Sequence, residues 1–182
     1  MPLASALSSP AALFRKLERE SYRAYHATSP THKADHFFNF CVTAASMRDY
    51  CLEHLGKIEK NDKRPYYQTW SQVPALVAAS EIANSSKHFV LRDKRSGVAT
   101  TPRTRTVRMK KSHFVSVYAH SDGKLSAVPT EHAEVSVTLS DGTILELHSF
   151  TKQVVDYWRA YIFSLGIKVR RQPLAHLSGR GA

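Results

Sequence analysis

The sequence predicts a single α+β domain, made of an N-terminal three-helix layer, a four-stranded antiparallel β-meander and a C-terminal helix. Apolar residues recur at three- and four-residue steps through the first half of the chain, which is typical of amphipathic helices. Stretches of period-two alternation, separated by Asp-Gly turns, follow and predict strands. With 182 residues, 42% of them apolar, the chain is long enough to bury a core without metal or disulfide staples.

The first two helices are predicted on either side of Ser29-Pro30-Thr31. Leu13 to Tyr25 places apolar side chains near one face and charged side chains on the others, so it predicts an amphipathic helix. The strongest helical pattern begins at Asp35 and runs to Gly56. We expect residues 1–12, which precede both helices, to be a flexible N-terminus.

The third helix is predicted after a charged connection. Lys57 to Arg64 is interpreted as a loop, because Pro65 disfavours helical backbone in the residue before it. A helical pattern then starts near Thr69 or Ser71. Pro74 fits its first turn, where a missing amide N–H costs little. The helical part therefore spans residues 13–91.

The meander and the last helix are predicted over residues 103–166. Asp-Gly in Ser121-Asp122-Gly123-Lys124 and in Ser140-Asp141-Gly142-Thr143 indicates two hairpins. Ser149 is a candidate N-cap for the last helix, Gly166 ends it, and residues 167–182 are expected to form a flexible basic tail. Four segments alternate with the period of a strand: Thr104 to Lys110, Phe114 to His120, Val135 to Leu139 and Ile144 to His148.

The positive charge is concentrated in two segments. The chain carries a net charge of +11. Lys87 to His113 holds nine basic residues against the single acid Asp93, and Lys168 to Ala182 holds four basic residues and no acid. Since a local positive field attracts polyanions, we expect a nucleic acid or an acidic protein surface as the partner. The alternative is a solvated basic loop and tail without a specific partner.

The candidate nucleic-acid-binding residues follow from this segment. Glu81, Asn84, Ser85 and His88 share one helical stripe beside it, which could position a phosphate or move a proton. Alternatively, His88 and Lys87 only complement a helix C-terminus. With Glu81 and Asn84 as the supporting polar stripe, the predicted contacts to nucleic acid are Lys87, His88, Arg92, Lys94, Arg95, Arg103, Arg105, Arg108, Lys110 and Lys111.

A second candidate lies in the long helix, at Arg48-Asp49-Tyr50-Cys51-Leu52-Glu53-His54. An arginine, a polar residue directly after it and a histidine a few positions on resemble the signature of HEPN-domain ribonucleases, and the resemblance covers residues 13–91. It implies a homodimer in which Arg48 and His54 cleave RNA without metal, through attack of the ribose 2′-hydroxyl on the adjacent phosphate. The alternative is an exposed surface on which Arg48 pairs with a carboxylate one turn away.

Aromatic residues flank the basic segment, and Tyr66 or Tyr67, in the polar connection, could stack on a base. Most of the other rings are expected in the core. Cys41 and Cys51 lie too far apart on one helix to form a disulfide, which favours a reducing, cytoplasmic location. His32 and His36, with Asp35, make a poor metal site, so no metal or cofactor is expected.

These observations rank three functions. The first is binding of RNA or DNA through backbone phosphates, with low sequence specificity. The second is a metal-independent ribonuclease of HEPN-like type. The third is a phage or mobile-element interaction protein that binds an acidic surface of another protein. No segment is apolar enough to cross a membrane, so we expect no membrane partner. The sequence does not decide whether the protein is an enzyme.

Overall fold

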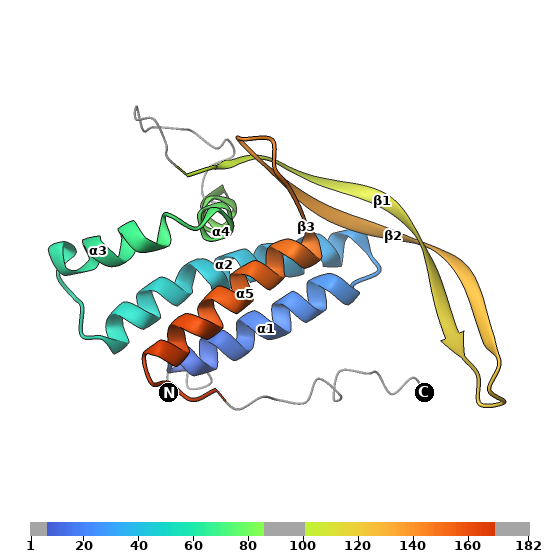
Figure 1. Ribbon diagram of the computed structural model, residues 1–182, viewed down its shortest axis with the longest axis horizontal. Helices are drawn as coiled ribbons and strands as arrows, with labels where there is room; N and C mark the ends of the chain where they lie inside the picture. The colour runs from blue at the N-terminus through green and yellow to red at the C-terminus, as the bar shows by residue number, and fades with distance from the viewer. Residues whose placement is uncertain (1–6, 86–100, 170–182) are drawn as a thin grey trace.

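The computed structural model describes residues 7–85 and 101–169 and confirms the α+β class. Figure 1 shows a helical body with a curved hairpin laid across one side of it. None of the described helices has the length and apolar character needed to cross a bilayer. In chain order the elements are α1 (Pro10–His26), α2 (Pro30–His54), α3 (Lys60–Trp70), α4 (Pro74–Ser85), β1 (Thr104–Ala119), β2 (Leu125–Leu139), β3 (Ile144–Glu146) and α5 (Leu147–Ser164).

The helical body consists of α1, α2 and α5, which run side by side, with α4 crossing over α2 (Figure 1). The largest fully buried side chains include Phe14, Phe40 and Trp158, one from each of the three long helices. Val135 and Val137 of β2 close the core from the sheet side. Burial of these apolar surfaces is the main source of stability for the body.

Glycine ends two of the long helices, as predicted. Gly56 follows α2 with a φ of 65°, and Gly166 follows α5 with a φ of 73°. The amide of Lys57 donates to the carbonyl of Leu52 at 2.8 Å. The amide of Ile167 donates to the carbonyl of Ile162 at 3.1 Å. This pattern caps the final carbonyls of a helix and needs the left-handed backbone that glycine adopts most readily.

The prediction that Lys57 to Arg64 forms a loop was wrong for most of the stretch, because α3 begins at Lys60 and contains Pro65. The N-terminal layer therefore holds four helices instead of three. Pro65 lies in the middle of α3, where its missing N–H removes one backbone hydrogen bond of the helix. Trp70, fully buried at the end of α3, lies 5.5 Å from Trp158 and 5.6 Å from Tyr161 between ring centroids.

The sheet is an antiparallel meander in the order β1-β2-β3, with three strands instead of the four expected. Two predicted strands form the single strand β1, because Lys111, Ser112 and His113 continue the ladder with β2. β2 also begins at Leu125, well before the predicted Val135. Backbone pairing along a hairpin needs no apolar pattern, so the sequence pattern revealed only the part of β2 that faces the core.

Both predicted hairpin turns are confirmed. Gly123 and Gly142 have φ values of 80° and 88°. A positive φ at the glycine of each turn is what the Asp-Gly pattern predicts. The Asp122 carboxylate accepts a hydrogen bond from the amide of Lys124 at 3.1 Å. The Asp141 carboxylate accepts one from the amide of Thr143 at 2.9 Å.

The last helix begins earlier than predicted. Glu146 is the N-cap residue of α5, and its side chain makes no capping hydrogen bond. Ser149 is instead an exposed residue of the first turn, so its prediction as the cap was wrong. The early start brings Leu147 and Phe150 into the core on the same side of α5, which contributes more than a single capping bond.

The β1–β2 hairpin has two distinct faces. Directly paired residues of an antiparallel ladder point to the same side, and successive residues alternate. We call core face the side that carries Val107, Met109, Val135 and Val137, since the last two are buried in the core. We call outer face the side that carries Thr106, Arg108, Lys110 and their partners.

Candidate nucleic-acid interface

Five of the predicted binding residues lie at or within β1, and the other five fall outside the described part of the chain. The described residues are Arg103, Arg105, Arg108, Lys110 and Lys111. Lys87, His88, Arg92, Lys94 and Arg95 belong to residues 86–100, which join the end of α4 to the start of β1 and lie outside the described residues.

The Glu81 side chain connects the start of β1 to α4. One oxygen of its carboxylate accepts a hydrogen bond from the amide of Thr104 at 2.8 Å, and the other lies 3.8 Å from the Arg103 guanidinium. The backbone of Arg103 also exchanges hydrogen bonds with Ser140, since its amide donates to the Ser140 hydroxyl at 3.1 Å and its carbonyl accepts from the Ser140 amide at 2.7 Å. Glu81 and Arg103 therefore position the strand.

Arg105, Arg108 and Lys110 are exposed side chains of β1. Arg105 lies where the register shifts between Thr104 and Thr106, so it occupies a β-bulge. A bulged residue is left outside the regular ladder, which re-aims its side chain. Arg108 and Lys110 lie two residues apart on the outer face, and β1 is the edge strand of the sheet. These three cations can therefore reach a ligand from solvent.

The protein's own carboxylates reduce the charge of this region. Lys111 belongs to the core-face side of the hairpin and forms an ion pair with Glu131 at 3.2 Å. Lys110 lies directly opposite Glu134 in the register of the outer face. The predicted row of cations is thus divided between two faces. Among the described residues, no carboxylate forms an ion pair with Arg105 or Arg108.

The described residues of the supporting polar stripe also differ in their contacts and exposure. Glu81 is half-buried and occupied by the start of β1. The Ser85 hydroxyl donates to the carbonyl of Ile82 at 2.6 Å, within its own helix. Asn84 is exposed, so it is the member of the stripe that a ligand can reach among the described residues.

Arg48 and His54 have different surroundings. The Arg48 guanidinium donates to the Ser80 hydroxyl and to the carbonyl of Leu76, each at 3.2 Å, and so links α2 to α4. Burial lowers the pKa of Arg48 from its ordinary value. His54 is the exposed last residue of α2. Six residues on an α-helix turn through about 240°, so the two side chains do not converge within one chain.

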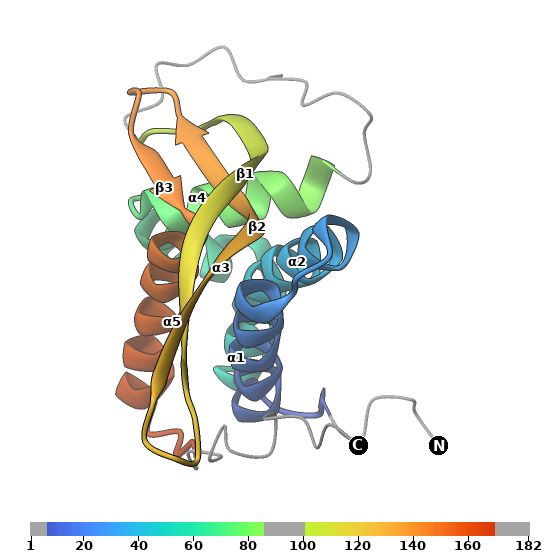
Figure 2. The same cartoon turned by 90° about the vertical axis from the view of Figure 1, so that its right-hand side faces the viewer.

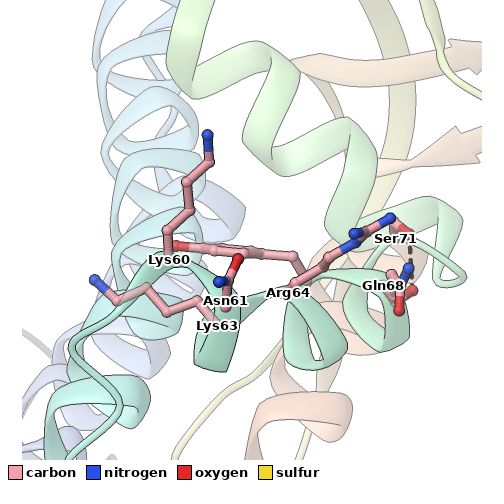
Figure 3. Close-up of a pocket in the computed structure, with 7 residues that line it drawn as sticks. Lys60, Asn61, Lys63, Arg64, Gln68 and Ser71 are labelled. Atoms are coloured by element: carbon pink, nitrogen blue, oxygen red, sulfur yellow. Dashed lines mark hydrogen bonds between the residues drawn. The ribbon is translucent and has the colours of Figure 1, made fainter.

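The structure shows a cationic hollow on α3 that the sequence analysis missed. It has a volume of about 650 Å³ and contains three basic side chains and no acid in its lining (Figure 3). Its basic positions follow the spacing of a helix face, a signal lost when this stretch was interpreted as a loop. The lining residues are Lys60, Asn61, Lys63, Arg64, Tyr67, Gln68 and Ser71.

The two tyrosines proposed for base stacking differ in exposure. Tyr66 is half-buried and packs near Trp70, with 6.0 Å between ring centroids. Tyr67 is 40% exposed and lines the hollow on α3. Its hydroxyl donates to the Asp49 carboxylate at 3.4 Å, and burial followed by this carboxylate raises the pKa of Tyr67. Tyr67 is therefore the ring that can meet a base.

The two cysteines and His36 contact other parts of the fold. Cys41 and Cys51 are free and buried, and burial raises the pKa of Cys51 to about 12. His36 faces the buried Glu20 carboxylate, with 3.1 Å between its Nδ1 and the nearer oxygen. Across the described parts of the chain, no group of three side chains is suited to hold a metal ion.

Comparison with known proteins gave no match, whether against family models, curated sequences or solved structures.

Proposed function

We propose that the protein binds nucleic acid through backbone phosphates, with its main contacts in residues 87–111. The supporting observation is the exposure of Arg105, Arg108 and Lys110 on an edge strand that directly continues the basic segment 86–100. That segment adds Lys87, Arg92, Lys94 and Arg95 against one acid, Asp93. Cations gathered in one stretch of chain neutralise phosphates and release their counterions, which drives binding.

The fixed position of the start of β1 supports this proposal. Glu81 and Ser140 hold Arg103 and Thr104 in place, so the chain enters β1 at a fixed point on the helical body. Arg105 and Arg108 follow on a strand whose backbone is fixed by pairing with β2. Fixing the backbone lowers the entropy that these side chains lose when they bind phosphates.

Sequence specificity is expected to be low. Base reading needs side chains that match the donors and acceptors on base edges, whereas phosphate contacts only position the nucleic acid. The hollow on α3 offers a second contact, in which Tyr67 stacks on an unpaired base and Lys63 or Arg64 holds the adjacent phosphate.

Affinity measurements on matched variants test this proposal. We expect the double variant Arg108→Ala/Lys110→Ala to bind labelled single-stranded RNA and duplex DNA about tenfold or more weakly than the wild type. The control variant Lys124→Ala/Lys152→Ala removes the same charge from the hairpin tip and from α5, where both lysines form ion pairs with aspartates. Its affinity should stay within about twofold of the wild type.

Two outcomes would contradict the proposal. One is no binding by the wild type at low salt, and the other is an equal loss of affinity in both double variants, which would reflect net charge alone. The RNA recovered after binding should also be intact. Cleavage that His54→Ala abolishes would instead support the ribonuclease hypothesis for Arg48 and His54.

A further inference from the structure

The outer half of the β1–β2 hairpin extends past the helical body. In Figures 1 and 2 the hairpin starts over α4 and β3 and continues as a two-stranded ribbon beyond the ends of α1 and α2. We call residues 113–131 the distal arm. Nearly all of its described side chains are exposed, whereas Val135 and Val137 of the same hairpin are buried in the core.

The core face of the hairpin continues into the distal arm as an apolar surface that no other described residue covers. Three successive cross-strand pairs on this face are apolar: Val115 with Pro129, Val117 with Ala127 and Ala119 with Leu125. The exposed fractions of Val115, Val117 and Leu125 are 65%, 63% and 72%. Contiguous exposed apolar side chains of this kind mark interaction surfaces on proteins.

The opposite face of the arm is mixed, because each of its cross-strand pairs joins an apolar or aromatic residue to a serine or a threonine. Tyr118 is 54% exposed and Val128 is 47% exposed, and both lie on the outer face. A sheet that keeps one side in water alternates apolar and polar residues. The arm keeps this alternation, so its core face is the side that a partner covers. A two-stranded hairpin is also only marginally stable in water by itself.

The charge of the distal arm differs from that of the chain. The chain carries +11, whereas the arm holds one lysine, Lys124, and two acids, Asp122 and Glu131. Lys124 forms an ion pair with Asp122 at 3.2 Å, and Glu131 forms one with Lys111 at 3.2 Å. A nucleic acid therefore gains little from this surface.

The size of the arm fits a reciprocal contact between two copies. Each strand of the arm is about 25 Å long, and the ribbon is about 10 Å wide. One arm whose core face is covered therefore buries about 500 Å², counted on both partners, which is less than the roughly 1,000 Å² that a stable interface needs. Two arms that each dock their core face on the other copy bury about 1,000 Å² in total, which reaches that size.

We infer that the distal arm is a dimerisation arm, whose apolar core face docks on a second copy of this chain. Contact through this face is favoured over added strand pairing along β2, because Pro129 supplies no amide donor. Most homodimers have two-fold symmetry, so the same surface serves in both copies. This inference does not depend on the proposed nucleic-acid binding.

Light scattering coupled to size exclusion tests it on the full chain after bound nucleic acid has been removed. We expect a dimer for the wild type and a monomer for Val117→Lys and for Leu125→Lys. Ile58→Lys and Phe163→Lys are matched controls, because they add the same charge at apolar residues that are 76% and 80% exposed on the helical body. Both controls should remain dimeric. Circular dichroism of each variant checks that the helical body is folded.

A wild type that stays monomeric at every concentration would overturn the inference, and would mean that another part of the chain or another protein covers the arm. A dimer that persists in both arm variants but dissociates in Ile58→Lys or Phe163→Lys would overturn it too. If Leu125→Lys alone unfolds, Val117→Lys still decides. A separate assay of nucleic-acid affinity keeps the two proposals distinguishable, since a monomeric arm variant retains Arg105, Arg108 and Lys110.

Discussion

The contacts of Arg48 in the structure are not those that its sequence motif indicates. In the sequence it belongs to a motif that resembles a ribonuclease signature. In the folded chain its guanidinium donates to Ser80 and to the carbonyl of Leu76, so it links two helices. The spacing to His54 is visible in the sequence, but the partners of Arg48 depend on how α4 crosses α2. No local pattern contains that information.

Removal of the Arg48 guanidinium should destabilise the fold. We expect Arg48→Ala to lower the free energy of unfolding by about 1–3 kcal/mol, because two partly buried hydrogen bonds between helices are lost. His54→Ala, at the exposed end of α2, should change it by less than about 0.5 kcal/mol. Urea unfolding of both variants measures the difference. Equal effects would show that Arg48 does not stabilise the contact between α2 and α4.

The raised pKa of Tyr161 predicts that the folded state loses stability at alkaline pH. Burial raises the pKa of Tyr161 to about 12 from an ordinary value of 10.0. The folded state therefore keeps the phenol protonated at a pH where the unfolded chain has ionised it. The stabilisation by Tyr161 is complete below pH 10, and it falls as the pH rises from 10 towards 12.

The comparison of wild type with Tyr161→Phe isolates this effect. The difference in unfolding free energy between the two proteins should stay constant up to about pH 9, then move in favour of the phenylalanine variant as the pH rises further. Urea unfolding at a series of pH values provides the measurement. A difference that stays constant through the alkaline range would show that Tyr161 ionises equally easily in both states.

At the scale of elements, the turns and helix ends were predictable, whereas the extent of the strands was not. Gly56, Gly123, Gly142 and Gly166 were identified because left-handed backbone needs a particular residue type at one position. The first half of β2 was missed because it packs on nothing in the core, and so no burial pattern marks it. The alternation around Val115 and Val117 was visible, but a pattern cannot show whether a face is covered.

α3 depends on one side chain for its place on the body. Trp70 is its only fully buried residue, and the rest of its surface, which carries the cationic hollow, is half-buried or exposed. Trp70→Ala should lower the free energy of unfolding by about 3–5 kcal/mol. Trp70→Phe should cost less, because it keeps an aromatic ring and removes an indole N–H that has no partner among the described residues. Tyr67→Ala, at an exposed ring of the same helix, is the control.

Hydrogen exchange along the chain locates the effect. We expect the amides of α3 to exchange faster in Trp70→Ala than in the wild type, by a larger factor than those of α1 and α5, since α3 has few other contacts that hold it. Unchanged exchange in α3 would contradict this account. A cost of Tyr67→Ala as large as that of Trp70→Ala would also contradict it.

At the scale of the molecule, the sequence showed which segments carry the positive charge. It did not show on which faces of the structure these charges lie. Counting residues located the excess in Lys87 to His113 and in the tail after Lys168. Strand alternation then placed Lys111 and Arg108 on opposite faces, and Glu81, Glu131 and Glu134 lie beside cations from which they are distant in sequence. Long-range pairing of this kind follows from topology, so the candidate site was predicted by region and only partly by residue.

The dependence of nucleic-acid affinity on salt tests the central claim most directly. If the cations of residues 87–111 bind phosphates, the logarithm of the binding constant should fall linearly and steeply with the logarithm of salt concentration between about 50 and 200 mM. Arg108→Ala/Lys110→Ala should reduce the slope by about 1.4 for a single strand and about 1.8 for a duplex, the loss of two phosphate contacts. An affinity that barely changes with salt, or a slope that the double variant leaves unaltered, would contradict the claim.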